Sequence, residues 1–381
     1  IDNPRTYAVV SHGITDNASR TVVKTITVKW VPKGTVTPDF AVFSRNTLEF
    51  GSANIYGSTT NDFAPIGSNT GIKTIGYYGR AGEVSVITEA SIDRSATNVQ
   101  LGTTNIIEEV IYPDPVFPDY PAHNSTLADV NRTDGSHADV YLNDESKVYY
   151  IDEFNLAGSS KVTLNIGDKD IKLVVGNFNI LQGHIFIEGT GTLKLYIDNI
   201  NFPAQGDSVI NPPDELNSYK LLSNEQIVNQ AIAMGQLNDA DHPENIEKRK
   251  TAANRLEMYY YGSETINITD SKFFHGNLIV KEGTLNFDGS GGFTGSVSTG
   301  GPVIVKGDAK ITTPLLYAPN STVEVLGGEF KGPIIGGTVT IGGPTASNPR
   351  VYYDPPGTPV PIPGSGDSGQ ANITEGVARE Q

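Results

Sequence analysis

Aromatic side chains gather at a few places in this chain, and clustered rings are well suited to binding a neutral sugar polymer. The densest cluster is three consecutive tyrosines, Tyr259, Tyr260 and Tyr261. A tyrosine ring offers an apolar face that can stack on the C–H face of a sugar, while its hydroxyl stays in water. Two smaller clusters stand among prolines or glycines, and their members are Tyr112, Phe117 and Tyr120, and Tyr77 with Tyr78. These eight rings are the predicted binding residues.

The same rings have a second interpretation, in which they pack one segment of the chain onto another. Tyr260 continues the apolar spacing of a helix, which favours a buried position. For the other tyrosines of the two larger clusters, packing and sugar binding stay equally open. The single tryptophan, Trp30, lies in a dense strand pattern and is expected in the core. The pair Tyr352 and Tyr353, next to prolines, is a weaker candidate for binding.

Paired carboxylates are the second kind of chemistry to weigh. Asp144-Glu145 and Asp152-Glu153 would lie on adjacent coils of a repeating fold. Hydrolysis of a glycosidic bond needs two carboxylates roughly 5–10 Å apart. The chain holds 43 acidic residues, so neighbouring acids are expected by chance. A lyase would also need a basic residue aligned with acidic ligands, which the strands do not offer. We therefore predict that the protein is not an enzyme.

A structural calcium ion is the only cofactor that the sequence suggests. Asp239, Asp241, His242 and Glu244 bring together hard donors of the kind that Ca²⁺ prefers. The segment lacks the loop glycine and the ligand spacing of an EF-hand. Its acids fit the N-terminus of a helix better, because they complement the helix dipole. Cysteine is absent and the histidines are scattered, so zinc is not expected either.

Charge and composition narrow the class of partner. The formal net charge is −16, which disfavours nucleic acid and anionic membrane surfaces. The sequence has no apolar run of the roughly 18 residues that span a bilayer. The chain starts at Ile1 without a methionine, and we expect it to be a mature or trimmed piece whose anchor would lie upstream.

The elements that would position these residues are short strands in a repeat. Between positions 265 and 343, β-branched residues recur among glycines, and Val303-Ile304-Val305 returns one repeat later as Val323-Glu324-Val325. Leu316 returns in the same way as Ile335. A period of about 20 residues indicates a unit that buries its apolar face only by stacking on its neighbours. We predict an all-β fold, a parallel right-handed β-helix with long loops.

The chain divides into one large domain and a tail. Residues 1–357 form the predicted β-helix domain, in which 112–134 is a proline-rich loop and 203–262 is an insertion with two helices. Ser223 and Gln226 resemble a capping box, Pro243 fits a first helical turn, and Gly262 fits a helix C-cap. Residues 358–381 are rich in proline and glycine and are expected to be a flexible tail.

One set of motifs resembles a known group of proteins. It comprises Tyr317-Ala318-Pro319-Asn320, the step from Gly328 to Gly337, and Val339-Thr340-Ile341-Gly342-Gly343. These resemble the C-terminal repeat of pilus-assembly proteins with a PilX-like N-terminus from Firmicutes. Within that group the chain is similar to the tāpirins, cell-surface proteins of cellulose-degrading anaerobic thermophiles that are linked to type IV pilus loci. The resemblance implies a β-helix that adheres to cellulose without cleaving it.

The leading hypothesis is therefore a non-catalytic, extracellular adhesin on the cell surface. Its partner would be crystalline cellulose or another insoluble plant polysaccharide, held by aromatic rings on a flat face of the β-helix. The second hypothesis is a structural subunit that packs against type IV pilus proteins and has no affinity for sugar. The third is a polysaccharide lyase or hydrolase. An exposed row of rings favours the first, an apolar patch without rings the second, and a cleft with convergent acids the third.

Overall fold

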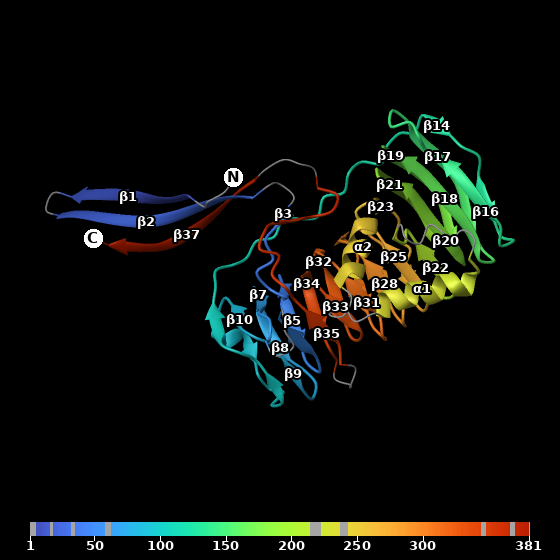
Figure 1. Ribbon diagram of the computed structural model, residues 1–381. Helices are drawn as coiled ribbons and strands as arrows, with labels where there is room; N and C mark the ends of the chain where they lie inside the picture. Colours follow the sequence, from blue (N-terminus) through green and yellow to red (C-terminus); the bar gives the residue numbers. More distant parts are fainter. Residues whose placement is uncertain are drawn as a thin grey trace.

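Most of the chain winds into a stack of short parallel strands, as predicted (Figure 1). The computed structural model describes residues 5–15, 18–31, 35–57, 62–213, 222–236, 243–343, 348–365 and 370–380. Within these ranges the stack has a 20-stranded sheet and a 12-stranded sheet, and each coil contributes strands to both. The fold is thus a parallel β-helix whose neighbouring coils pair along their whole length.

The strands are short because glycines and turns interrupt each coil. The 20-stranded sheet contains β4 (Val42–Ser44), β5 (Thr47–Phe50), β7 (Ile66–Ser68), β8 (Gly71–Thr74), β10 (Val84–Val86), β11 (Ile92–Asp93), β13 (Thr104–Ile106), β14 (Ser125–Thr126), β15 (Val130–Arg132), β17 (Val148–Leu156), β19 (Asp170–Ile180), β21 (Thr192–Asn201), β23 (Leu256–Tyr260), β24 (Ile266–Ile268), β26 (Asn277–Val280), β27 (Leu285–Phe287), β29 (Val297–Thr299), β30 (Val303–Val305), β32 (Leu316–Val325) and β34 (Ile334–Ile341). The 12-stranded sheet contains β6 (Asn54–Tyr56), β9 (Gly79–Arg80), β12 (Val99–Gln100), β16 (His137–Tyr141), β18 (Ser160–Gly167), β20 (Gly183–Gly189), β22 (Ser208–Ile210), β25 (Lys272–His275), β28 (Gly292–Thr294), β31 (Lys310–Thr312), β33 (Glu329–Lys331) and β35 (Arg350–Tyr352). A 3-10 turn, η1 (Glu89–Ser91), precedes β11.

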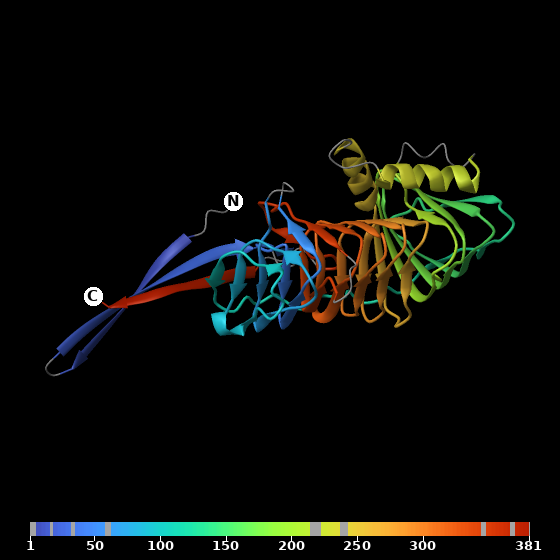
Figure 2. The same ribbon diagram turned by 90° about the horizontal axis from the view of Figure 1, so that it is seen from below.

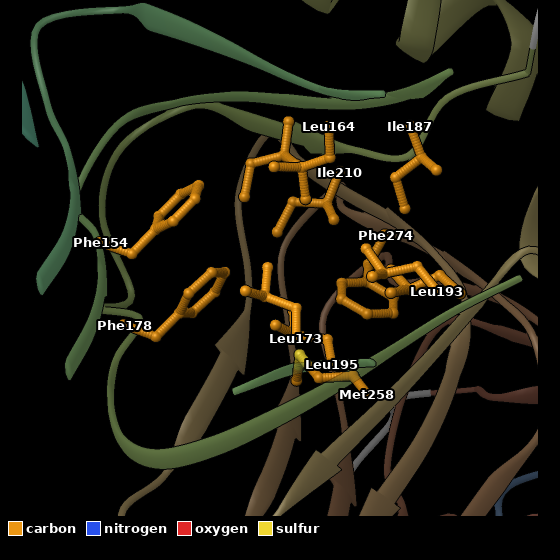
Figure 3. A pocket seen from close by; sticks show the side chains of 12 residues that line it. Phe154, Leu164, Leu173, Phe178, Ile187, Leu193, Leu195, Ile210, Met258 and Phe274 are labelled. Atoms are coloured by element: carbon orange, nitrogen blue, oxygen red, sulfur yellow. The ribbon is translucent and has the colours of Figure 1, made fainter. Parts of the chain in front are cut away.

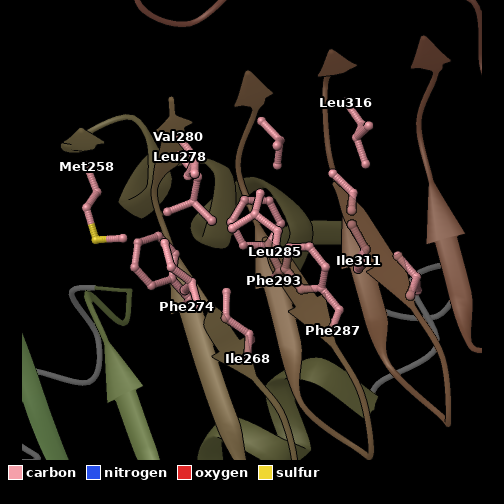
Figure 4. Close-up of a cluster of buried hydrophobic side chains, with 14 of the residues drawn as sticks. Met258, Ile268, Phe274, Leu278, Val280, Leu285, Phe287, Phe293, Ile311 and Leu316 are labelled. Carbon is pink, nitrogen blue, oxygen red and sulfur yellow. The ribbon is translucent and has the colours of Figure 1, made fainter. Parts of the chain in front are cut away.

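The predicted repeat is confirmed in the register of the strands. Val303 pairs with Val323 and Val305 with Val325, so like residues stack on like. Figure 4 shows the resulting column of buried side chains, among them Phe287, Phe293 and Ile311. One expected match is wrong, because Leu316 pairs with Ile334 rather than with Ile335. Side chains alternate along a strand, so Ile335 belongs to a separate cluster outside the column.

The interior is wider where the coils of β17 to β23 lie. Figure 3 shows aromatic and aliphatic side chains around a small void there, including Phe154, Phe178 and Met258. Its volume is about 10 Å³ and its lining is wholly apolar. A water molecule needs at least that much room and several polar partners. The void is therefore a packing gap in the core and not a ligand site.

The coils do not follow the order of the sequence. The chain begins in the middle of the stack with β4, β5 and β6 and winds outward to β12 and β13. It then crosses to the opposite end and winds back from β14 to β35. The two halves meet where β34 pairs with β4 and β5 and β35 pairs with β6. Figure 1 shows this seam as blue strands beside red ones.

Residues 107–124, which we call the strap, make the crossing between the two halves. They carry no strand or helix. They run over the outer face of the 20-stranded sheet and include residues 112–124 of the predicted proline-rich loop. Its last residues differ from the expectation, because β14 and β15 already belong to the first coil of the second half.

Both ends of the chain leave the solenoid at the seam. β3 (Thr35–Val36) pairs with β36 (Val360–Pro361), and β2 (Ala18–Val31) lies between β1 (Arg5–Thr15) and β37 (Gln370–Glu380) in an antiparallel sheet. Figure 2 shows this three-stranded sheet projecting away from the coils. The expected flexible tail is thus largely strand, because β2 offers it a free edge for pairing. Trp30 lies in β2, and its side chain is outside the described part of the chain.

The insertion holds the two predicted helices, α1 (Asn224–Gln236) and α2 (Pro243–Ala253). The capping box is confirmed, since Ser223 N donates to Gln226 Oε1 at 2.9 Å and Gln226 N to Ser223 Oγ at 3.3 Å. α1 packs on outward residues of the 12-stranded sheet, including Phe186 and Phe273. The proposed C-cap at Gly262 is wrong, because the chain already re-enters the stack at β23, where pairing on both sides outweighs the helical spacing.

Candidate functional site

The predicted binding rings separate into two groups, and the larger group is packed under or along the strap. Tyr259 lies on β23 and is only 4% exposed. It stacks on Tyr196 with ring centroids 4.7 Å apart, and its hydroxyl donates to Glu257 Oε2 at 2.6 Å. Burial and the nearby Glu257 carboxylate raise the pKa of Tyr259. A ring held in this way cannot lie flat on a polysaccharide.

Strap residues cover this pair of tyrosines. Tyr120 meets Tyr196 and Tyr261 edge-on, with centroid distances of 6.4 and 5.4 Å. Phe117 packs against the same cluster. The Tyr261 hydroxyl donates to the carbonyl oxygen of Pro118 at 2.8 Å, which fixes the strap to β23. The half-buried rings here are therefore an internal contact between the strap and the solenoid.

Tyr112 and Tyr260 are buried at two other places. Tyr112 is in the strap and meets Phe43 and Tyr317 edge-on, at centroid distances of 5.2 and 6.4 Å. Tyr260 points into the interior column and is 1% exposed. Its hydroxyl accepts a hydrogen bond from Glu264 N at 2.9 Å. Tyr260 is therefore buried, as its spacing favoured. Tyr112 and Tyr259 do not form an exposed platform, because neighbouring chain segments already occupy their surfaces.

Tyr77 and Tyr78 form the second group and lie in the open. Their exposed fractions are 71% and 40%. Tyr78 lines a groove of about 550 Å³ on the outer face of the 12-stranded sheet, where the coils of β6, β9 and β12 meet. The groove is lined by Asn54, Tyr56, Phe63, Tyr78, Gly79, Arg80, Thr97, Asn98 and Gln100. We call it the β9 groove.

A stack of three rings reaches the β9 groove, and two of them, Tyr56 and Phe63, line it. Tyr352, Tyr56 and Phe63 follow one another with centroids 5.3 and 5.7 Å apart and planes within 25° of parallel. Lys331 lies 5.7 Å from the Tyr352 ring and Arg80 lies 5.9 Å from the Phe63 ring, so a cation stands near each end. The faces of these rings lie against one another, so a ligand meets mainly their edges and hydroxyls.

A glycine makes room for this stack. Tyr352 on β35 pairs in register with Tyr56 on β6. The next level is filled by Phe63, which forms an isolated bridge with Tyr56. A Cβ at Gly82 would lie 2.1 Å from the carbonyl oxygen of Phe63. Only glycine leaves the backbone space that this position of Phe63 needs.

The β9 groove combines the groups that recognise neutral sugars. Tyr78 supplies a partly exposed ring, and the side chains of Asn54, Asn98 and Gln100 supply amide donors and acceptors. Arg80 adds a planar donor that can bond two hydroxyls together. Sequence inspection found Tyr78 but missed the amides, because Asn54 comes from the coil of β6 whereas Asn98 and Gln100 come from the coil of β12. In the structure, Asn54 on β6 pairs with Arg80 on β9, and this stacking of coils brings the groove residues together.

The candidate catalytic acids make local hydrogen bonds. Asp144 accepts from Ser146 Oγ at 2.6 Å, and this interaction with Ser146 lowers the pKa of Asp144. Asp152 accepts from the Tyr150 hydroxyl at 2.7 Å, and Glu153 accepts from Asn177 Nδ2 at 2.8 Å. A general acid in a glycosidase needs a raised pKa, which the environment of Asp144 opposes.

The suggested calcium ligands cannot be placed together. Asp239, Asp241 and His242 lie outside the described residues, and Glu244 is in the first turn of α2, as the helix-dipole interpretation expects. Among the described residues there is no group of three or more His, Asp or Glu side chains that could hold a metal ion. Nor does any helix in that part of the chain have the length and apolar character to cross a bilayer.

Comparisons with known proteins do not indicate a function for this site. A family described as "Domain of unknown function (DUF7305)" matches residues 121–236, which run from just before β14 to the end of α1. No curated protein matches the chain. The structure of the competence-associated pilin ComZ from Thermus thermophilus is similar at 9% identity and a TM-score of 0.28, covering 99% of this chain and 81% of that one. At that TM-score the likeness carries no argument, and the resemblance to tāpirins stays a prediction.

Proposed function

We propose that this protein is a non-catalytic, extracellular polysaccharide-binding protein of the cell surface and that the β9 groove holds the sugar chain. The proposed partner is cellulose or another insoluble plant polysaccharide. The observation that carries the proposal is the meeting of a partly exposed tyrosine with three amide side chains in one open groove. Rings and amides match the alternating C–H faces and hydroxyl edges of an uncharged glucan.

The position of the groove supports a polymer as the ligand. It lies across strands from neighbouring coils and is not covered by the strap, which crosses the other sheet. A single open groove of this kind gives modest affinity, because few groups are fully desolvated. Many copies on one cell would bind an insoluble surface through avidity.

The absence of catalysis is part of the same proposal. The groove is lined by amides, hydroxyls, rings and one guanidinium, and its lining includes no carboxylate. Hydrolysis by the usual route needs a pair of carboxylates on the two sides of the glycosidic bond. We therefore expect binding without release of sugar.

The test is a binding assay with microcrystalline cellulose in which both protein and soluble sugar are measured after centrifugation. The wild-type chain should be depleted from the supernatant without sugar release. Tyr78→Ala combined with Gln100→Ala should weaken binding by about tenfold, which corresponds to about 1.4 kcal/mol. Leu181→Ala is the control, since Leu181 is 41% exposed between β19 and β20 and is not part of the groove lining.

Either of two results would count against the proposal. Wild-type protein left in the supernatant would remove cellulose as the ligand, and the same assay on xylan and mannan would then decide whether the β9 groove binds any plant polysaccharide. Released reducing sugar would show that the protein is an enzyme.

A structural role in a pilus-type assembly is the second candidate. The sheet of β1, β2 and β37 favours it, because β1 and β37 each pair with β2 on one side only within the described residues. Free strand edges on a projecting sheet are suited to accept a strand from another protein. Co-purification with pilus proteins that survives deletion of the Tyr78 ring would support this role over sugar binding.

A further inference from the structure

We propose that copies of this chain join end to end, with the β16 end of one solenoid docking on the β12 end of the next. The β16 end comprises residues 125–142 and the β12 end comprises residues 92–106. Each end therefore binds a second copy of this chain. The inference does not depend on the proposed sugar binding.

The hydrophobic column reaches the β16 end without being fully covered. Ala138 and Val140 pair with Val162 and Leu164, which are buried residues of the column. Both Ala138 and Val140 are only half-buried, and so is Leu127 beside them. Side chains that continue the core therefore face the surface at the last coil.

The β12 end shows the same feature. Ile92, Val99 and Leu101 are half-buried and pack on the end of the same column. Ile106 on β13 pairs with Val86, which is fully buried, yet Ile106 itself is 61% exposed. Each end thus presents apolar residues at positions that the next coil would cover in the middle of the stack.

Strand direction selects which two ends can meet. The strands within both large sheets pair in parallel, so one end of the ladder is complementary to the other and not to itself. Two β16 ends related by a two-fold axis would have to pair antiparallel. A head-to-tail contact instead repeats the coil-to-coil geometry already present at the seam, where β34 and β4 join segments from opposite ends of the sequence.

In the view of Figure 1, the three-stranded sheet lies to one side of the solenoid and not on either end. Both termini leave at the seam in the middle of the stack, and the strap lies along the side (Figures 1 and 2). The contact is heterologous, and because it continues the stacking of coils along the solenoid axis it would build an open row of solenoids rather than a closed ring. The formal charge of −16 opposes close approach of two copies, and salt should therefore strengthen the association by screening.

The test is sedimentation velocity of the full chain at rising concentration, at low and high salt. The wild type should form a series that extends beyond a dimer. Ile106→Asp blocks the β12 end and Val140→Asp blocks the β16 end, and each should weaken self-association by about tenfold or more. Leu181→Asp is the matched control, because Leu181 is 41% exposed between β19 and β20, on the side of the stack.

Mixing the two single variants is the decisive step. Each keeps one intact end, and the intact ends are complementary, so the mixture should give a 1:1 complex that grows no further. The double variant should bind neither partner. If Asp disturbs folding, as seen by circular dichroism, Ile106→Ser and Val140→Ser take its place.

Three outcomes would overturn the proposal. The first is a wild-type chain that stays monomeric at every concentration and salt level. The second is a pair of single variants that each still dimerise alone, which would indicate a two-fold contact. The third is an effect of Leu181→Asp equal to that of the end variants.

Discussion

The outer faces of the two sheets use the same residue types in opposite ways. On the 20-stranded sheet, Tyr196 and Tyr259 are buried beneath the strap, and the Tyr259 hydroxyl donates to Glu257. On the 12-stranded sheet, Tyr56 and Tyr78 border an open groove beside amide side chains. The difference shows that a tyrosine on a β-helix surface acquires its role from what crosses over it. The tyrosines beneath the strap serve to hold the fold together. Those on the other sheet, which the strap does not cross, are available for a ligand.

Truncation of a ring under the strap should have the largest effect and separates the two faces directly. Tyr259→Ala removes a ring that is buried against Tyr196 and leaves a cavity, which typically lowers the free energy of unfolding by about 3–5 kcal/mol. Tyr78→Ala, at a partly exposed ring, should change it by no more than about 0.5 kcal/mol. Urea denaturation of both variants checks this. Equal losses would mean that the two faces do not differ in the way proposed.

The solenoid itself could be predicted from sequence because its signals are local. The glycine spacing and doublets such as Val303 to Val305 lie within one repeat, and the pairing with Val323 follows from the period. The capping box at Ser223 and the start of α2 at Pro243 are local as well. Features that depend only on one repeat, or on one repeat and the next, could therefore be predicted from the sequence.

Features that depend on contacts between distant parts of the chain could not be predicted from the sequence. The order of the coils is one example, because β4 pairs with β34, which comes from the other half of the sequence. Burial of Tyr259 and Tyr112 depends on the path of the strap, which no pattern in the rings records. The groove could not be predicted for the same reason, since Asn54, Tyr78 and Gln100 come from three coils and meet only after the coils stack.

Mild acid should lower the free energy of unfolding without changing cellulose binding. This is the next largest effect that we expect. His184 and His275 are buried, and burial lowers their pKa values from 6.5 to about 4 and about 3. His184 must be neutral to accept from Val209 N at 3.1 Å, while its other ring nitrogen bonds Asn224. The unfolded chain gains protons below pH 6.5 and the folded chain does not. The free energy of unfolding should therefore fall by about 1.4 kcal/mol per histidine for each pH unit between 6.5 and roughly 5.

The β9 groove contains no histidine or carboxylate in its lining, so cellulose binding by folded protein should not change over the same pH range. Thermal unfolding and the binding assay, run in parallel at several pH values, measure the two quantities. His184→Gln should reduce the pH slope of stability and leave binding unaltered. Binding that weakens in step with stability would show that the groove depends on the helix-covered part of the solenoid.

Removal of a single hydroxyl under the strap should have a smaller effect. Tyr261→Phe keeps the ring contact with Tyr120 but loses the donor to the carbonyl oxygen of Pro118. A lost hydrogen bond of this kind costs about 0.5–1.5 kcal/mol. Tyr141→Phe, on an exposed ring, is the control and should cost nothing measurable. Denaturation midpoints compare the two variants, and cellulose binding should be the same for both.

The polar attachment of the strap should contribute least. Arg45 Nη1 lies 3.3 Å from Asp114 Oδ1, and Asn320 Nδ2 donates to the same oxygen at 2.9 Å. The bond from Asn320 and the charge of Arg45 lower the pKa of Asp114, whose side chain is nevertheless 74% exposed. Exposed ion pairs contribute about 0.2–1 kcal/mol, so Arg45→Ala should hardly move the unfolding midpoint.

The strap should still respond locally to this change. Hydrogen exchange in residues 107–116 should be faster in Arg45→Ala than in the wild type, because one of its attachments to the solenoid is gone. The matched control is Lys73→Ala, which breaks an exposed pair with Glu49 at 3.0 Å between neighbouring coils and leaves the strap alone. Equal exchange in the two variants would mean that the remaining contacts hold this half of the strap without Arg45, among them the Tyr112 ring and the two hydrogen bonds between Asn69 and Val110.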